Sequence, residues 1–300
     1  MPHAEPHAPS PNGSIRLVVT CPDQPGLIAA VTLFTAQQNG NIIGADQFTD
    51  ADTGTFFLRL AIQLSHDTDA EGFGAAFRPL ASRHNMTFRV ETADRPKRTA
   101  ILVSKTSHCL SDLVQRIHEG ELGIEPTLVL SNHPDLERLA AFAGAPFHHL
   151  PLDPNAPAGH PTHRLEQERA MEELLLEHDI EFVVLARYMQ VLSPGFVDRW
   201  FGRVINIHHS FLPAFSGARP YHRAHERGVK VIGATSHYVT SVLDEGPIIT
   251  QATTRVDHRD SVADLIRKGR DLERMVLAEA VRLHAEDRVL ISGNRTVVFS

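Results

Sequence analysis

The chain has 300 residues, a formal net charge of −7 and a hydrophobic fraction of 42%. This length is at the upper end for a single core and favours two domains, and the absence of a basic excess argues against nucleic acid or an anionic membrane as a partner. Its cysteines, Cys21 and Cys109, are far apart in sequence, so neither a disulfide framework nor a thiolate zinc site is supported.

The first residues are polar and rich in proline, without a basic stretch followed by an apolar one. No window reaches the roughly 18 apolar residues of a membrane span. We therefore expect a disordered tail over residues 1–14, no membrane partner and a cytoplasmic location.

Residues 15–92 alternate between strand-like and helix-like patterns. Strands are predicted at 15–21, 42–49, 55–64 and 86–91, and helices at 27–38 and 70–84. The resulting order, β-α-β-β-α-β, predicts a small ferredoxin-like domain.

The segment CPDQPGLIAAVTLFTAQQNGNI resembles the loop and first helix of ACT domains. The resemblance implies an amino-acid effector, methionine or glycine, and assembly into a homo-oligomer. A helix N-terminus offers free N–H groups to a carboxylate, so an effector would bind at Asp23, Gln24, Pro25, Gly26 and Leu27. In the alternative, Pro25 and Gly26 only begin a helix in a domain that serves oligomerisation.

Residues 93–98 are charged and contain a proline, which is typical of a linker. From 99 to 300, apolar strands alternate with helices, which predicts a doubly wound, mostly parallel sheet. Its strands are expected at 99–104, 126–130, 147–150, 182–185 and 204–207, and its helices at 110–118, 136–143 and 162–178. No G-x-G-x-x-G fingerprint follows a strand, so the fold alone indicates no dinucleotide cofactor.

The last third departs from this alternation. Residues 230–239 and 247–256 flank a turn at 243–246 and predict antiparallel strands. A long helix is expected at 262–284, followed by a hairpin from 289–291 to 296–299.

Polar residues follow two of these strands. An amide such as Asn206 can stabilise an oxyanion, an imidazole such as His208 can move a proton, and a carboxylate such as Asp244 can orient the imidazole. Each residue taken alone is also compatible with ordinary turn chemistry.

The patterns N-I-H-x-S-x-L-P, from Asn206, and H-Y-V-x-x-x-L-D-x-G-P-I-I, from His237, resemble the formyltransferases that use 10-formyltetrahydrofolate. The resemblance implies that Asn206, His208 and Asp244 are catalytic, with His237 beside them. LARYMQVLSP resembles the folate-binding turn of this family, although apolar residues such as Met189 and Leu192 can also be plain core. The implied folate contacts are Met189, Gln190, Val191, Leu192, Thr240, Ser241 and Leu243.

In the transferases, a glycine-rich loop after the first catalytic strand holds the phosphate of the acceptor. Here the corresponding stretch, Ser104 to Cys109, has no glycine, so close approach of a phosphate is disfavoured and water is the acceptor that remains. With the ACT-like segment, the chain is similar to formyltetrahydrofolate deformylases over residues 15–300. This resemblance implies hydrolysis of 10-formyltetrahydrofolate to formate, for purine synthesis, and tetrahydrofolate, without a further cofactor.

Other functions are less well supported. The neighbouring histidines 208, 209, 222, 225 and 237 raise the possibility of a metal, but no H-E-x-x-H motif or cysteine pair accompanies them. Formyl transfer to an amine remains open as an alternative. So does a non-catalytic amino-acid sensor, which the intact Asn206, His208 and Asp244 argue against.

Overall fold

The computed structural model describes residues 13–65, 68–152, 161–214 and 220–300. The chain forms two compact units. Of the described residues, one unit comprises those up to Arg95 with Glu286–Leu290 and Val297–Ser300, and the other comprises those within Pro96–Ala285 with Ile291–Thr296. The predicted tail at 1–14 lies outside the described residues except for its last two, and Ser14 already belongs to a strand. Among the described residues, no helix combines the length and apolarity needed to cross a membrane.

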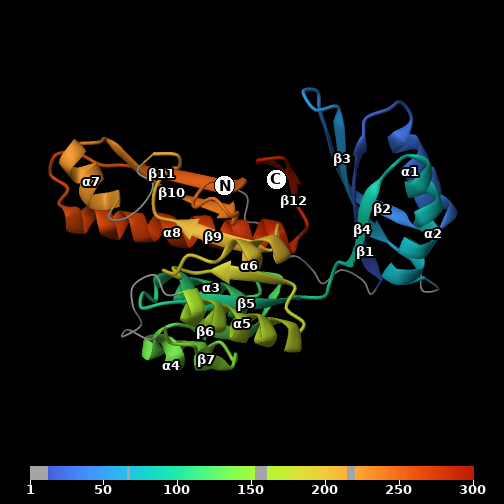
Figure 1. Ribbon diagram of the computed structural model, residues 1–300. Coiled ribbons are helices and arrows are strands. Elements are labelled where there is room, and N and C mark those ends of the chain that lie inside the picture. The colour runs from blue at the N-terminus through green and yellow to red at the C-terminus, as the bar shows by residue number, and fades with distance from the viewer. Residues whose placement is uncertain (1–12, 66–67, 153–160, 215–219) are drawn as a thin grey trace. The chain divides into compact units, whose positions relative to one another are not determined.

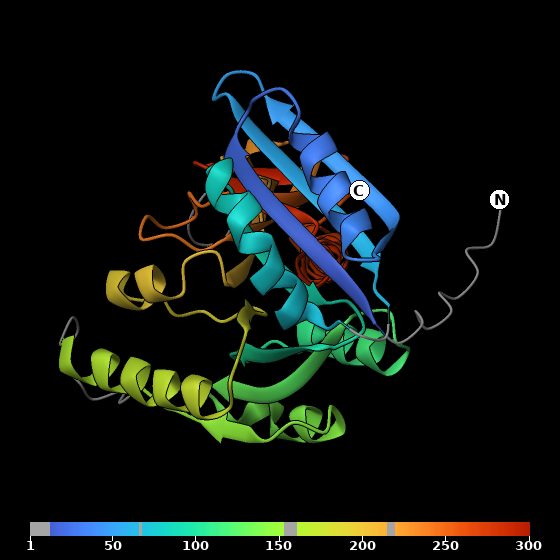
Figure 2. The ribbon, with the colours of Figure 1, turned by 90° about the vertical axis from the view of Figure 1, so that its right-hand side faces the viewer.

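The first unit is built on a four-stranded antiparallel sheet in the order β2-β3-β1-β4. This topology confirms the predicted ferredoxin-like arrangement, and Figure 2 shows both helices on one face of the sheet. The elements are β1 (Ser14–Pro22), α1 (Leu27–Gln37), β2 (Asn41–Asp50), β3 (Thr55–Gln63), α2 (Ala70–Arg83) and β4 (Thr87–Thr92).

Both faces of this sheet bury apolar side chains. On the helix side, Leu17 of β1 packs in one core with Phe73 and Phe77 of α2. On the other side, Val18 and Phe57 pack with Leu290 and Phe299 near the C-terminus. The C-terminal segment therefore completes the first unit, whereas the sequence had assigned all of 99–300 to the second domain. The reason is that successive side chains of a strand point to opposite faces, so each apolar face needs its own cover.

A buried carboxylate holds this C-terminal segment on the first unit. Asp287 is 1% exposed, and its oxygens lie 3.3 Å from Arg16 Nε and 3.3 Å from Arg89 Nη2. Arg59 Nε also donates to the carbonyl oxygen of Glu286 at 3.1 Å. Two strands of the sheet thus pair with a carboxylate that lies two residues beyond the last helix.

The second unit has a seven-stranded sheet in the order β11-β10-β9-β8-β5-β6-β7. The pairs from β9 to β7 are parallel. Strand β10 pairs antiparallel with β11, as the sequence predicts, and also antiparallel with β9, which was not predicted. Figure 1 shows the long helix α8 lying along β9, β10 and β11. The first elements are β5 (Lys97–Val103), α3 (His108–His118), β6 (Ile124–Ser131), the 3-10 helix η1 (Pro134–Leu136), α4 (Glu137–Phe142), β7 (Phe147–His149), α5 (Pro161–Glu177) and β8 (Phe182–Leu185). They are followed by α6 (Pro194–Arg199), β9 (Val204–His208), α7 (Pro220–Arg227), β10 (Val231–Tyr238), β11 (Ile248–Arg255), α8 (Val262–Ala285), β12 (Val289–Ser292) and β13 (Arg295–Val298).

Two details differ from the sequence-based expectation. Strand β5 begins at Lys97, so the end of the predicted linker at 93–98 is part of the sheet. Helices α6 and α7 were not predicted, because Pro194 and Gly195 in α6 and Pro220 in α7 are typical of loops.

The order of the strands in this sheet determines where the site lies. After β5 the chain moves to β6 and β7 on one side, and after α5 it returns to β8 and β9 on the other. In such sheets, ligands bind at the carboxyl ends of the strands where the winding direction reverses. The loops after β5 and β8, together with the end of β9, meet at this position.

Candidate active site

A cavity of about 580 Å³ lies at the carboxyl ends of β5, β8 and β9. Every residue that the sequence predicts for catalysis or folate contact lines it. These residues are Asn206, His208, His237 and Asp244, together with Met189, Gln190, Val191, Leu192, Thr240, Ser241 and Leu243. The structure thus brings together three segments that are far apart in the sequence and that the motifs had identified one by one.

Asn206 and His237 face each other across neighbouring strands. They are register partners on β9 and β10, and Asn206 Nδ2 lies 3.2 Å from His237 Nε2. His237 Nδ1 lies 2.9 Å from the carbonyl oxygen of Tyr238, which can only accept, so Nδ1 carries the proton and Nε2 accepts from Asn206. Burial lowers the pKa of His237 and keeps the ring neutral. His237 therefore fixes the amide of Asn206, whose second N–H is left for a ligand.

His208 and Asp244 form a buried pair. His208 Nδ1 lies 3.1 Å from Asp244 Oδ1, and the two side chains are 6% and 9% exposed. Burial alone would raise the pKa of Asp244, but the hydrogen bond from His208 and the charge of that ring lower it. The other ring nitrogen, His208 Nε2, is buried and has no hydrogen-bond partner among the described residues. An oriented imidazole with one nitrogen free of protein partners can exchange a proton with a molecule bound beside it.

The backbone conformation around Asp244 allows the contact between Asp244 and His208. Asp244 adopts a left-handed conformation with φ of 59°, which aspartate tolerates better than most residues. A side chain on Gly246 would collide with the carbonyl oxygen of Tyr238, its Cβ lying only 1.7 Å away. Glycine is therefore required where this turn passes close to β10.

The predicted folate-binding turn is held in place by buried polar side chains. Ser104, at the end of β5, accepts a hydrogen bond from the backbone N–H of Met189 at 3.1 Å. Glu168 of α5 accepts from the backbone N–H of Ser193 at 2.7 Å and also from the hydroxyl group of Ser193. Both ends of the turn are thereby fixed to other elements of the same unit.

Apolar side chains on this turn differ in their exposure. Met189 and Val191 are 59% and 51% exposed, and Leu243 across the cavity is 59% exposed. Leu192, in contrast, is 8% exposed and belongs to the core of the sheet. Exposed apolar groups around a cavity are typical of a binding site, while Leu192 fits the core-packing alternative as well.

A second buried carboxylate in the cavity wall was missed by the sequence reasoning. Glu273 of α8 contacts His108 from α3, Arg187 after β8 and Tyr221 from α7. Burial alone would raise the pKa of Glu273. Hydrogen bonds from His108 and Tyr221 and the charge of Arg187 outweigh this effect and lower the pKa of Glu273. The four residues belong to four separate segments, so no local motif could have indicated them.

The predicted effector segment forms an exposed turn ahead of α1. Gly26 adopts φ of 90° at the helix N-cap, and Asp23 N–H donates to the carbonyl oxygen of Gly54 at 2.8 Å. Asp23, Gln24 and Pro25 are exposed, but Leu27 is 2% exposed and belongs to the core of the first unit. Leu27 is therefore better explained as packing than as a ligand contact.

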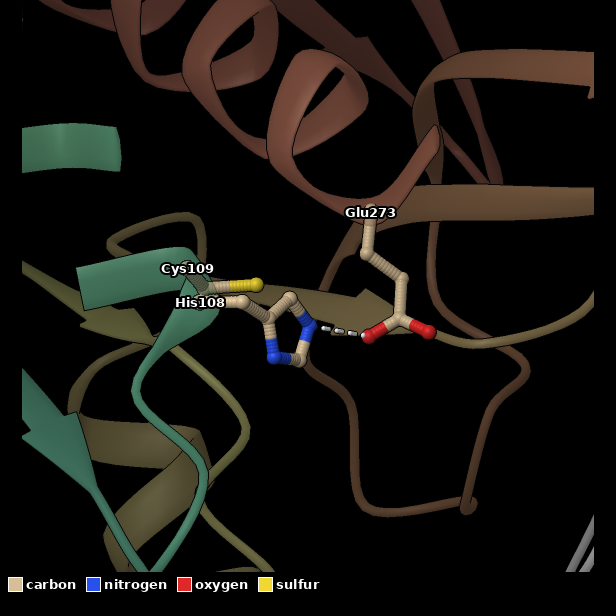
Figure 3. A group of neighbouring side chains, drawn as sticks. All are labelled: His108, Cys109 and Glu273. Atoms are coloured by element: carbon tan, nitrogen blue, oxygen red, sulfur yellow. Dashed lines mark hydrogen bonds and ion pairs between the residues drawn. The ribbon is translucent and has the colours of Figure 1, made fainter. Parts of the chain in front are cut away.

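Among the described residues, the grouping that could hold a metal is not the histidine set suggested by the sequence. It consists of His108, Cys109 and Glu273, whose ligand atoms lie within 4.8 Å of one another (Figure 3). Burial raises the pKa of the Cys109 thiol well above its usual range, which disfavours the thiolate that a metal needs. Both carboxylate oxygens of Glu273 also have protein partners. These residues therefore fit a hydrogen-bonded cluster better than a metal site.

Comparison with known proteins agrees with this geometry. The formyl transferase family model matches residues 97–281, which is most of the second unit. A solved glycinamide ribonucleotide transformylase from Symbiobacterium toebii is 33% identical, covers 68% of this chain and 94% of its own, and has a TM-score of 0.62. These matches account for the catalytic half alone.

Other relatives match both units. A formyltetrahydrofolate deformylase from Synechocystis sp. is 51% identical over 96% of this chain and 99% of its own length. The relative of the same name from Bacillus subtilis is 47% identical over 95% of this chain and 93% of its own. A solved formyltetrahydrofolate deformylase from Pseudomonas syringae, 45% identical, superposes with a TM-score of 0.90 over 96% of this chain and 94% of its own. With similarity of this extent over both units, the chain belongs to the formyltetrahydrofolate deformylase family.

Proposed function

We propose that this chain hydrolyses 10-formyltetrahydrofolate to formate and tetrahydrofolate. The observation that carries the proposal is the meeting of Asn206, His208, His237 and Asp244 in one cavity, with His208 Nε2 free of hydrogen-bond partners among the described residues. The exposed apolar rim and the anchored turn at 189–193 suit the flat pterin ring of a folate. The names of the full-length relatives agree with this reaction.

The reaction would begin with attack of water on the formyl carbon. His208, with Nδ1 held by the Asp244 carboxylate, takes the proton of the water at Nε2. The formyl oxygen gains negative charge, which the free N–H of Asn206 stabilises, since His237 fixes the amide. The C–N10 bond then breaks, N10 takes the proton from His208, and formate and tetrahydrofolate leave. No cofactor takes part in this scheme.

The direct test is incubation of the protein with 10-formyltetrahydrofolate and no amine acceptor. Formate and tetrahydrofolate should form in equal amounts, as quantified by a formate dehydrogenase assay and by absorbance. A protein that forms formate only when an amine is added, or not at all, would contradict the proposal. Formate released in this way would be available for purine synthesis.

We also propose that the first unit is an ACT-type domain that mediates regulation and homo-oligomerisation. The exposed turn at Asp23–Pro25 and the helix N-terminus behind Gly26 support an amino-acid carboxylate as ligand. Methionine or glycine should change the rate of formate release, and sedimentation should give a mass above that of one chain. Unchanged rates with both amino acids would contradict the effector, and a monomer mass would contradict the assembly.

The free, buried Cys21 and Cys109 suit the cytoplasmic location that we propose for this reaction.

A further inference from the structure

Three neighbouring strands carry a row of polar side chains that begins at His208. Strands β9, β10 and β11 lie side by side in the sheet (Figure 1). In their pairing, Thr235 of β10 lies opposite His208 of β9 and also opposite Gln251 of β11. Residues directly opposite each other in antiparallel strands point to the same face of the sheet. The imidazole, the hydroxyl and the amide therefore share one face, although the proposed attack on the formyl group uses only the imidazole.

The hydroxyl group of Thr235 binds the backbone that follows His208. Thr235 is 0% exposed. Its Oγ1 donates to the carbonyl oxygen of Ser210 at 2.8 Å and accepts from the backbone N–H of Leu212 at 3.0 Å. It also accepts from Gln251 Nε2 at 2.9 Å. Since a hydroxyl group offers one hydrogen and two lone pairs, these bonds use its whole capacity.

The side-chain amide of Gln251 completes this arrangement. Gln251 Nε2 lies 3.1 Å from the carbonyl oxygen of Leu212, which can only accept. The amide nitrogen therefore faces the segment, with one hydrogen directed to Leu212 and the other to Thr235. Leu212 is buried, and both its N–H and its carbonyl group are bonded through these two side chains. Without Gln251, the carbonyl group would lose this partner, which favours movement of the segment.

The backbone of β10 leaves space for the same segment. A Cβ on Gly233 would lie 2.9 Å from the Cβ of Phe211. Gly233 precedes Thr235 by two residues, so both positions belong to the same face of β10. Glycine therefore allows residues 210–212 to lie directly against the strand that holds them.

These contacts restrict the position of His208 itself. His208 is the last residue of β9, and its imidazole is bonded to Asp244 at 3.1 Å. Pairing of β9 with β10 fixes the backbone before His208, while Thr235 and Gln251 fix the backbone two to four residues after it. A displacement of about 1 Å in a catalytic group can lower a rate by about 10²-fold. Loss of the later contacts should therefore be seen in the chemical step.

We propose that Gln251 is a positioning residue of the hydrolysis. Acting through Thr235 and the backbone of residues 210–212, it holds His208 where Nε2 takes the proton of the attacking water. The inference rests on the proposed hydrolysis. The folate-binding turn at 189–193 is anchored separately, by hydrogen bonds to other elements, so folate affinity should not depend on Gln251.

The first experiment compares turnover with ligand affinity. The variants are Gln251→Met and Thr235→Val, which keep the size and remove the hydrogen bonds, and Thr235→Ser, which keeps the hydroxyl group. The turnover number of Gln251→Met and Thr235→Val should fall by at least about tenfold, and Thr235→Ser should recover most of it. Tetrahydrofolate affinity, measured by calorimetry, should stay within about twofold. Thr253→Val, an exposed threonine of β11, is the matched control and should behave like the wild type.

The second experiment tests whether Gln251 acts through His208. Gln251→Met is combined with Asp244→Asn, which already removes the other contact that orients the imidazole. Formate release is measured in single turnovers with the protein in excess, so that slow variants are quantified. Gln251→Met should lower the rate at least about tenfold in the wild type but less than about twofold in Asp244→Asn, because residues that act as a unit are not additive. A general loss of structure would lower both rates by the same factor.

Both results are required. A wild-type turnover number in Gln251→Met would overturn the proposal, as would an equal fold-loss in the two backgrounds. Should Gln251→Met fail to fold, as judged by circular dichroism, Thr235→Val and Thr235→Ser decide by the same readouts. A wild type that releases no formate would refute the proposed hydrolysis, whereas normal hydrolysis by both the wild type and Gln251→Met refutes this inference alone.

Discussion

Asp244 combines a left-handed backbone with a hydrogen bond to the imidazole of His208. Asparagine also tolerates this conformation, so Asp244→Asn should fold while losing the charge that orients His208. We expect the turnover number to fall by about 10²–10³-fold, the usual contribution of a positioned acid–base group. Formate release under saturating substrate, together with tetrahydrofolate binding by calorimetry, checks this expectation. Glu245→Gln, at the exposed neighbouring position, is the matched control and should keep its activity; unchanged turnover in Asp244→Asn would contradict the mechanism.

His209 gives the protein a predicted pH dependence of stability. Burial lowers the pKa of His209 to about 3, whereas an unfolded histidine titrates near 6.5. Between these values the unfolded chain binds a proton that the folded protein does not, so stability is lost as the pH falls below 6.5. The loss by pH 5 should be about 2 kcal/mol from this residue.

Urea unfolding at pH 7 and pH 5 tests this expectation. The variant His209→Gln should lose less stability than the wild type over the same interval. His237, whose pKa burial also lowers, acts in the same direction in both proteins and does not affect the difference. An identical loss in both proteins would show that His209 is not the titrating group.

The motif residues of the site could be predicted from the sequence because each lies in a continuous segment with a distinctive pattern. The segments at 185–194, 206–213 and 237–249 needed only the fold to bring them together. Glu273 and Arg187 could not be predicted, since their pairing depends on how α8 packs beside β8 and β9. A buried ion pair between distant segments leaves no periodicity in the sequence.

At the scale of elements, the turn after β8 depends on α5. The carboxylate of Glu168 accepts two hydrogen bonds from Ser193, and bonds to a charged group contribute roughly 1.5–3 kcal/mol each. Glu168→Gln retains a single acceptor oxygen and should loosen the turn at 189–193. We expect the KM for 10-formyltetrahydrofolate to rise by about tenfold, with a smaller change in kcat.

Steady-state kinetics with a matched variant separates this effect from a general loss of charge. Glu172 lies one turn further along α5 and pairs with the exposed side chain of Arg199. Glu172→Gln should change KM by less than about twofold, because exposed ion pairs contribute little. Equal KM values in the wild type and Glu168→Gln would show that the turn does not need this anchor.

Asp287 should be the most sensitive polar residue of the first unit. It too has a positive φ, of 56°, so Asp287→Asn keeps the backbone and removes only the charge paired with Arg16 and Arg89. Breaking a buried ion pair typically costs about 3 kcal/mol. Chemical unfolding should show this loss, while Asp271→Asn, an exposed aspartate of α8, should unfold like the wild type. A wild-type midpoint for Asp287→Asn would contradict this assignment.

The helices and strands themselves were largely predictable, but with informative exceptions. Long periodic segments such as 262–284 coincide with α8 to within a residue. The short helix α6 was missed because its stabilising feature is the side chain of Ser193, which accepts from the N–H of Phe196 at 3.3 Å and caps a segment otherwise typical of a loop.

At the scale of the whole molecule, two units with separate cores should unfold in separate steps. Calorimetry should resolve two transitions, and tetrahydrofolate should raise the temperature of one of them, since ligand binding stabilises only the unit that binds. A single transition that shifts as a whole would contradict independent unfolding. Asp287→Asn provides the complementary control, because it should lower the other transition.

The two-domain organisation followed from chain length and pattern, but not which residues close the first unit. Leu290 and Phe299 cover the face of the first sheet that the helices leave open. The pattern of residues 15–92 does not indicate that these residues, far along the chain, pack there. The apolar residues on that face predict that some segment packs against it. Which segment does so depends on where helix α8 ends.

The return of the C-terminal segment to the first sheet has a consequence for biosynthesis. Domains generally fold as units while the chain emerges from the ribosome, with N-terminal domains first. Here the sheet of the first unit emerges early, yet the side chains that cover Val18 and Phe57 are translated only after helix α8. The part of the protein that is made first must therefore wait, with one apolar face open, until Leu290 and Phe299 have been synthesised.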